Sequence, residues 1–384
     1  MKNTADNDAS KHTPASFVIA SIAFSIVIVL VVGEVLLRAI PIPGIELNTT
    51  RADSLTGFGS YPGSTMTYRN ARGDFVRRKI NRWGYPDKDY GREKRKGCYR
   101  VGFFGDSFTE ARQVPLEQTF FRLAEDSVGS DRVECLSFGV SGLGTLQSFL
   151  NCGRWARFLD LDMVVYVFYE NDVGDQMRDV RREPCMPYAA IMGETLVVDT
   201  SFKRDCWAKR QRIIYRVGDY LTSRSLVFAT ISQRLQILLR YGVQPMPTGK
   251  DEPATAGTHA EAYGDVGPKQ GTAPSTWPDS LREYAELLEA TVLLKWQHSL
   301  EAERRRFVIM AVPPTLDPYD RDSWKTWLEK FCTKHGIDFI DPTDELLREQ
   351  ENGNEVFYDH FSKHGHVAFA RSFANWFKTN AMRN

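Results

Sequence analysis

A serine that follows a short apolar run is the first residue of this sequence that could do chemistry. Val101 to Phe104 is brief, apolar and followed by turn-forming residues, which predicts a buried parallel strand. The tripeptide Gly105-Asp106-Ser107 comes next, and its glycine can adopt the backbone angles of a sharp exit. Ligands of open α/β sheets bind outside the carboxyl ends of the strands, so we expect Ser107 to face a site. To act as a nucleophile, its hydroxyl needs a base and donors that hold an oxyanion.

Three further segments place residues with suitable chemistry at the same edge of the predicted sheet. Gly142 lies in a glycine-rich turn after the second predicted strand, Asn171 follows the third, and His360 precedes the carboxyl-terminal helix. Each residue type suits one task in acyl transfer. A glycine lets its backbone amide approach a substrate oxygen, an asparagine side chain donates a hydrogen bond, and a histidine takes and returns a proton. We therefore expect these residues to converge on Ser107.

These blocks, in this order, resemble the SGNH (GDSL-like) hydrolases, a superfamily of serine esterases with a flavodoxin-like fold. The matching pieces are Gly105-Asp106-Ser107, Gly142, Asn171-Asp172 and a histidine directly before the last helix, and they span the chain from about Tyr99 to its end, apart from the insertion and loop described below. The resemblance implies a double displacement, with Ser107 as nucleophile and His360 as general base and then general acid. It also implies an oxyanion hole made by the Ser107 amide, the Gly142 amide and the Asn171 side chain, and no metal or organic cofactor.

The acid that orients the histidine departs from the family pattern. Family members usually place this aspartate three residues before the histidine, sometimes two, whereas Asp359 directly adjoins His360 here. Adjacent side chains diverge in extended backbone, so Asp359 can orient the imidazole only if the chain turns sharply at this point. The alternatives are a backbone carbonyl, Asp317 or Asp341.

The sequence disfavours two other classes of function. Its 49 basic and 49 acidic side chains give no net charge, whereas nucleic-acid-binding proteins usually carry a basic surplus on one face. His360, His364 and His366 are close in sequence, but residues two positions apart on a helix do not face each other. We therefore expect neither nucleic-acid binding nor a metal site.

The order of the predicted elements indicates an α/β fold. Apolar runs that end in polar or glycine turns alternate with helical patterns, which is typical of a parallel sheet with helices on both faces. The sequence thus predicts a flavodoxin-like three-layer α/β/α sandwich with a mostly parallel five-stranded sheet, plus an amino-terminal transmembrane helix. The strands are expected at Val101–Phe104, from Val133, at Met163–Tyr169, from Phe307 and at Ile337–Ile340.

An apolar stretch near the amino terminus has the length needed to cross a bilayer. Residues 1–16 are polar, and residues 17–38 carry one charge, Glu34, before Arg38. The apolar run exceeds the ~7–15 residues of a cleaved signal peptide and no small-residue cleavage site follows it, so we favour an uncleaved anchor. Basic residues on the two sides nearly balance, so charge does not fix the orientation. Membrane-anchored members of the family have a similar helix ending in Glu and Arg, which implies a single-pass anchor and an extracytoplasmic domain.

The remaining segments are expected to surround this core. Residues 39–98 read as an irregular lead-in with room for a small antiparallel ribbon, and residues 99–384 form the hydrolase-like domain. Residues 178–242 interrupt its alternation of strands and helices, and we interpret them as an insertion that caps the site. Residues 245–278 are too poor in apolar side chains to offset the entropy of ordering, which predicts disorder.

Within the insertion, Leu196–Thr200 is expected to be half of a hairpin and Arg210–Leu239 to be helical. Cys185 and Cys206 lie together in it, outside the predicted sheet. If the domain lies outside the cytoplasm, a disulfide between them is expected.

The combined interpretation is a serine esterase that acts on O-acyl esters, including O-acetyl esters, of an extracytoplasmic carbohydrate or lipid. Its expected partners are this substrate and the membrane. Some members of the family act on O-acetylated extracellular polysaccharide. Two alternatives stay open: an O-acetyltransferase of exopolysaccharide modification, which would use the same acyl-enzyme, and a catalytically inactive carbohydrate-binding module.

Overall fold

The computed structural model describes residues 14–40, 42, 46–70, 72–193, 195–241, 277–316 and 323–381. The stretch expected to be disordered, 245–278, lies outside the described residues except for its last two positions. Asp317 and residues 1–13 of the polar tail also lie outside them.

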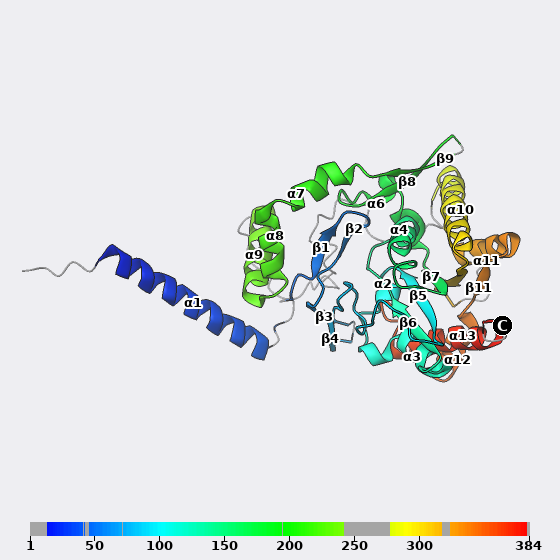
Figure 1. Cartoon of the computed structure of the whole chain (residues 1–384), viewed down its shortest axis with the longest axis horizontal. Helices are drawn as coiled ribbons and strands as arrows, with labels where there is room; N and C mark the ends of the chain where they lie inside the picture. The colour runs from blue at the N-terminus through cyan, green and yellow to red at the C-terminus, as the bar shows by residue number, and fades with distance from the viewer. Residues whose placement is uncertain are drawn as a thin grey trace, which may run out of the picture.

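A five-stranded sheet forms the centre of the domain (Figure 1). Its strands are β5 (Tyr99–Gly105), β6 (Val133–Ser137), β7 (Met163–Phe168), β10 (Arg306–Ala311) and β11 (Asp338–Ile340). Their spatial order is β6-β5-β7-β10-β11, and every pairing is parallel. Along the chain this is the flavodoxin-like order 2-1-3-4-5, in which ligands bind where the winding reverses, here between β5 and β7. The predicted sheet is confirmed.

Helices cover both faces of this sheet. Phe103 packs against Phe120 on one face, and its neighbour Phe104 packs against Trp296 on the other, because successive side chains of a strand point to opposite sides. On the first face lie η1 (Leu116–Gln118), α3 (Phe120–Val128), α12 (Thr343–Glu351) and α13 (Lys363–Asn380). On the second lie α4 (Thr145–Trp155), α10 (Asp279–Ala302) and α11 (Trp324–His335). The three-layer arrangement is therefore confirmed.

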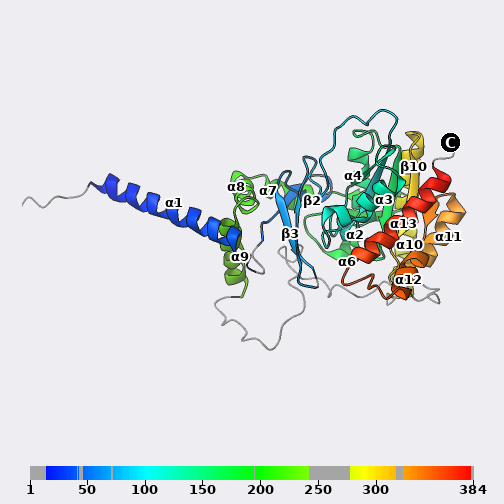
Figure 2. The ribbon, with the colours of Figure 1, turned by 90° about the horizontal axis from the view of Figure 1, so that it is seen from below.

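Helix α1 (Ala15–Ala39) extends away from the domain in both views (Figures 1 and 2). None of its 25 residues is buried. At 1.5 Å per residue it is about 37 Å long, enough for a hydrocarbon core of about 30 Å. By length and composition it can cross a membrane, a property that it shares with signal sequences. The expected span of residues 17–38 lies within it.

The lead-in contains two antiparallel ribbons. These are β1 (Thr50–Asp53) with β2 (Gly57–Ser60), and β3 (Thr65–Arg69) with β4 (Phe75–Lys79). Asp53 joins the first ribbon to α4 through Arg154, whose two terminal nitrogens lie 2.7 and 2.8 Å from its carboxylate oxygens. Arg78 of the second ribbon is buried and donates a 3.0 Å hydrogen bond to the carbonyl of Glu110. Both ribbons are thus tied to the α/β core.

The insertion follows α5 (Asn171–Asp175) and contains a hairpin and several helices. Its elements are α6 (Arg178–Arg181), β8 (Tyr188–Met192), β9 (Thr195–Asp199), the π-helix η2 (Lys203–Trp207), α7 (Ala208–Arg210), α8 (Ile213–Thr222) and α9 (Leu226–Tyr241). The stretch expected to be helical over 210–239 therefore contains two helices, α8 and α9, after the last residue of α7. The backbone becomes extended at Arg212 and the chain turns again after Ser223, which separates them.

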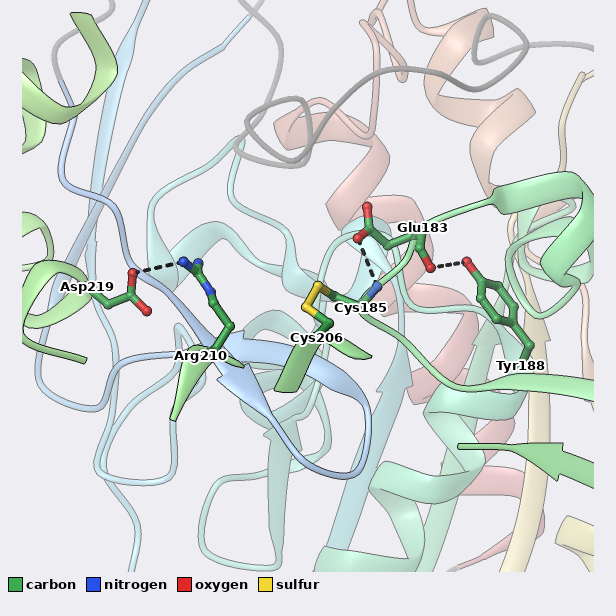
Figure 3. The surroundings of a disulfide bond; sticks show 6 residues. All are labelled: Glu183, Cys185, Tyr188, Cys206, Arg210 and Asp219. Carbon is green, nitrogen blue, oxygen red and sulfur yellow. Dashed lines mark hydrogen bonds and ion pairs between the residues drawn. A yellow bond between two sulfur atoms is a disulfide. The ribbon is translucent and has the colours of Figure 1, made fainter. Parts of the chain in front are cut away.

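Cys185 and Cys206 form a disulfide, as expected, with their Cα atoms 5.3 Å apart (Figure 3). The bond joins the segment before β8 to η2. Beside it, Glu183 accepts a 3.2 Å hydrogen bond from the Cys185 amide, and its carbonyl accepts one of 2.7 Å from the Tyr188 hydroxyl. The other four cysteines are free and buried.

Candidate active site

Ser107 lies just beyond the carboxyl end of β5, as the first residue of the short helix α2 (Ser107–Glu110). Gly105 permits this exit because an added Cβ there would lie 2.4 Å from Thr109 Oγ1. Asp106 caps the helix by accepting a 2.9 Å hydrogen bond from the Phe108 amide. Burial raises the pKa of Asp106 despite this hydrogen bond. The turn thus fixes Ser107, half-buried, at the edge of the sheet.

His360 reaches this serine from the loop before α13. Its Nε2 atom lies 2.7 Å from Ser107 Oγ, a hydrogen-bond distance. The Phe108 ring packs against the imidazole, with the ring centroids 4.8 Å apart. Ser362 caps α13 by accepting hydrogen bonds from two backbone amides of its first turn, which fixes the end of the loop. The arrangement has the geometry that a general base and its nucleophile need.

The loop turns sharply at His360. Phe357 and Phe361 form an antiparallel bridge, and the Tyr358 amide donates a 2.8 Å hydrogen bond to the His360 carbonyl. The turn brings Asp359 Oδ2 to 3.4 Å from His360 Nδ1. This distance is within ion-pair range. Nδ1 is buried and makes no other hydrogen bond with a described residue. The imidazole holds the pKa of Asp359 well below its ordinary value, against the opposing effect of burial.

A tyrosine of the lead-in binds the same carboxylate oxygen of Asp359. The hydroxyl of Tyr68, in β3, donates a 2.9 Å hydrogen bond to Asp359 Oδ2, the oxygen that faces the imidazole. The Arg112 guanidinium lies 4.6 Å over the Tyr68 ring. Burial raises the pKa of Tyr68 to about 12, so its hydroxyl stays a donor at neutral pH. The sequence alone does not predict a role for Tyr68, because nothing in the irregular lead-in distinguishes this residue.

The alternative acids do not take this position within the described residues. Asp341 pairs with Lys325 Nζ at 2.6 Å and accepts a 2.9 Å hydrogen bond from the Thr343 amide. Asp317 is not among the residues that the structure describes. Of the two acids described, Asp359 is the one beside the imidazole of His360.

The glycine-rich turn that contains Gly142 passes between the ends of β5 and β7. At Gly139 an added Cβ would lie 2.2 Å from the Glu110 amide nitrogen, next to α2. At Gly144 an added Cβ would lie 2.5 Å from the Asp172 carbonyl, next to α5. Gly142, with a φ of +79°, lies between these two close approaches. The turn therefore comes to the same edge of the sheet as Ser107.

Asn171 is the first residue of α5 and contacts a charged pair that the sequence analysis missed. Its Nδ2 atom donates a 3.0 Å hydrogen bond to Asp175, which in turn lies 3.4 Å from Arg181. Arg181 Nη2 is 2.9 Å from the position that a Cβ on Gly142 would occupy. Burial raises the pKa of Asp175 to about 6, although Arg181 opposes this effect. The four-residue spacing of Asn171 and Asp175 on a helix is the signal that could have found this acid.

The histidines near His360 have other partners. His364 Nδ1 lies 3.7 Å from Glu349, and His366, which is buried, accepts a 3.3 Å hydrogen bond from the Phe120 amide. In the described part of the chain, no three histidine, cysteine or acidic side chains are grouped as metal ligands.

Several solved structures share parts of this architecture at low sequence identity. They include TesA, with 9% identity and a TM-score of 0.38 over 73% of this chain and 98% of TesA. A member of the lipolytic protein G-D-S-L family from Veillonella parvula has 13% identity and a TM-score of 0.37 over 75% of this chain and 100% of its own. The acetyl xylan esterase AlAXEase has 14% sequence identity and a TM-score of 0.36, over 72% of this chain and 98% of its own. A scan against protein-family models finds no match, and neither does a search of curated proteins.

Proposed function

We propose that this chain is a carboxylic ester hydrolase of the SGNH (GDSL-like) type. The observation that carries the proposal is the 2.7 Å distance between Ser107 Oγ and His360 Nε2. The two residues meet at the carboxyl edge of a parallel sheet with the flavodoxin-like strand order. Asp359 faces the other ring nitrogen of His360. A hydroxyl, an imidazole and a carboxylate in this sequence of contacts are the nucleophile, the base and the orienting acid of a serine esterase.

In the first half of the proposed reaction, Ser107 Oγ attacks the ester carbonyl while His360 Nε2 takes its proton. The carboxylate of Asp359 stabilises the imidazolium that forms. His360 then gives the proton to the leaving alcohol, and an acyl ester of Ser107 remains. In the second half, His360 deprotonates a water that attacks the acyl carbon. The proton returns to Ser107 as the carboxylic acid leaves.

Three groups are proposed to hold the oxyanion. They are the backbone amide of Ser107 at the start of α2, the backbone amide of Gly142 and the side-chain amide of Asn171. The Asn171 amide has two hydrogens: one is donated to Asp175 at 3.0 Å, and the other, which also interacts with Asp106, would have to turn to the substrate. Donors fixed in place in this way stabilise the charge that develops on the carbonyl oxygen.

The proposed substrates are O-acyl esters, including O-acetyl esters, of a carbohydrate or lipid outside the cytoplasm. The proposed location is the membrane surface, with α1 as a single-pass anchor. The Cys185–Cys206 disulfide supports an extracytoplasmic domain, because such bonds persist in oxidising compartments. Protease added to intact spheroplasts should digest the domain, and a protected domain would contradict this orientation.

Labelling with a fluorophosphonate tests the serine. The purified full chain should be labelled, and Ser107→Ala should abolish the label. Ser127→Ala, an exposed serine of α3, is the matched control and should be labelled as the wild type is. A folded wild-type chain that resists the reagent, or a label that persists in Ser107→Ala, would overturn the proposal.

An acetyl-donor assay tests whether water completes the second half of the reaction. A hydrolase should release free acetate at a similar rate with and without a polysaccharide acceptor. Acetylated acceptor formed in preference to free acetate would contradict the hydrolase assignment, while leaving the acyl-enzyme unaffected.

A further inference from the structure

Helix α8 turns its apolar side outward and its polar side toward the protein. The exposed apolar residues on the outward side are Ile213, Ile214, Val217 and Tyr220, the first two with 73% and 74% of their surface accessible. Asp219 and Thr222, on the opposite side, are buried. Surface helices of globular proteins ordinarily have the reverse arrangement. An apolar face of this kind marks an interaction site.

Helix α9 continues this pattern. Ile231, Leu235 and Leu238 are exposed and follow one another at four and three residues, which places them on one face. Ala229, near the start of the same helix, is buried. The two helices pack against each other. We define the outer apolar face by seven residues, Ile213, Ile214, Val217, Tyr220, Ile231, Leu235 and Leu238.

The carboxyl-terminal end of α1 is bound to the start of α9. Glu34 accepts hydrogen bonds of 2.7 Å from the Ser225 hydroxyl and 3.1 Å from the Val227 amide. Arg38, which pairs with Glu34 at 2.6 Å, donates a 2.8 Å hydrogen bond to the Arg224 carbonyl. Both views show α8 and α9 at the end of the domain nearest α1 (Figures 1 and 2). Because Glu34 and Arg38 close the apolar run, this contact lies where α1 would leave the bilayer.

We propose that α8 and α9 lie on the bilayer that α1 crosses, with the outer apolar face inserted at the boundary between headgroups and acyl chains. The occupant of this face is lipid, because the bound end of α1 holds both helices at the level of the membrane surface. Tyr220, on the outer apolar face, suits the aromatic belt of an interface. Arg212, just before α8, and Arg216, within it, are exposed and can meet lipid phosphates.

This inference rests on the membrane-anchoring part of the proposed function and not on the ester chemistry. A second contact with the bilayer would prevent the domain from rotating freely about α1. The insertion would then fix the orientation of the active site relative to the membrane. This role differs from the cap predicted for the insertion, which stays a prediction.

The experiment places a fluorophore on single introduced cysteines in the full chain, reconstituted in lipid nanodiscs. Ile214→Cys on α8 tests the inference, and Val27→Cys in the middle of α1 tests the anchor. Met192→Cys on β8 is the control, an apolar residue with 68% of its surface accessible, at the end of the insertion away from α1 (Figure 1). The native free thiols are buried, so the thiol reagent labels only the introduced cysteine.

Spin-labelled lipids then report depth. We expect labels near the headgroups to quench Ile214→Cys several-fold more than Met192→Cys, and labels deep in the acyl chains to quench Val27→Cys most. Quenching at residue 27 without quenching at residue 214 would overturn the inference and keep the anchor. No quenching at residue 27 would overturn both.

An aqueous quencher identifies a competing occupant. Protection of Ile214→Cys from iodide without quenching by lipid means that protein covers the outer apolar face, which also overturns the inference. Fluorophosphonate labelling of the same samples reads out the ester chemistry separately, so a failure of the membrane contact cannot be mistaken for a failure of the proposed reaction.

Discussion

The hydroxyl of Tyr68 donates a 2.9 Å hydrogen bond to Asp359 Oδ2, the oxygen that lies 3.4 Å from His360 Nδ1. The lead-in thereby contacts the loop that carries the proposed base. Arg72, in the turn between β3 and β4, makes a second contact with this part of the chain, an exposed ion pair with Glu355 at 2.9 Å. The ribbon β3–β4 therefore helps to position His360, although it precedes the α/β domain in the sequence.

Replacing Tyr68 with Phe should lower kcat by about tenfold and leave KM nearly unchanged, because a hydrogen bond to a charged group contributes about 1.5–3 kcal/mol and other contacts keep part of the geometry. Without the hydroxyl, Asp359 loses the group that holds its Oδ2 atom toward the imidazole. Steady-state hydrolysis of a soluble ester by the full chain in detergent measures both constants.

Tyr358→Phe is the matched control for this substitution. Tyr358 lies in the loop that carries Asp359 and His360. Its ring, not its hydroxyl, lies under the Arg72 guanidinium, 4.6 Å from it. This variant should keep the wild-type kcat. A Tyr68→Phe enzyme as fast as the control would show that Asp359 is held in place without Tyr68.

The central sheet could be predicted because each strand carries its own signal. The runs that became β5, β7 and β10 are short, apolar and followed by turn-forming residues, so no distant contact is needed to recognise them. The helices of the insertion lack this independence. The sequence predicts helix throughout Arg210–Leu239 and does not show where α9 begins. Its start lies beside the hydrogen bond between Ser225 and Glu34 of α1, a contact between residues 191 positions apart.

The candidate site divides in the same way. Ser107, Asn171 and His360 could be proposed together because the carboxyl ends of parallel strands meet at one edge. The role of Asp359 depended on a sharp turn that local sequence did not determine. Tyr68 could not be found at all, because it reaches Asp359 across 291 positions of the chain.

Removing the proposed side-chain oxyanion donor should affect chemistry more than binding. Asn171→Ala is expected to lower kcat by about a hundred- to a thousandfold with a small change in KM, because the donor acts mainly on the charge of the transition state. Asn171→Asp keeps the shape and removes the donor, so it should lose at least as much activity. A loss below tenfold in Asn171→Ala, with unchanged thermal stability, would remove Asn171 from the oxyanion hole.

Removing the disulfide should loosen the insertion. The bond closes a loop between residues separated by 21 positions, and for a loop of about this size the loss is about 3 kcal/mol. Cys185→Ser should therefore speed limited proteolysis between residues 186 and 205 strongly. The double variant with Cys206→Ser should lose the same amount of stability as Cys185→Ser alone, because one substitution already breaks the bond. A much larger loss in the double variant would mean that Cys206 stabilises the insertion in another way.

Glu289 should make the protein less stable as the pH rises. It is buried in α10, where its carboxyl contacts the Thr145 hydroxyl at 2.8 Å and the Gln176 amide at 2.5 Å. Burial raises the pKa of Glu289 from 4.5 to about 8. Between these two values the folded chain keeps a proton that the unfolded chain releases, so the free energy of unfolding falls as pH rises through this window. Below it both states are protonated, and above it the loss is complete.

Glu289→Gln tests this because the amide stays neutral at every pH while keeping the shape of the side chain. The melting temperature of the wild type should fall more between pH 6 and pH 9 than that of the variant, by several degrees for each kcal/mol removed. Glu283→Gln changes an exposed glutamate of the same helix and should follow the wild type. If Glu289→Gln also follows the wild type, the proton on Glu289 is not retained in the folded state. The buried contacts with Thr145 and Gln176 would then involve a charged carboxylate.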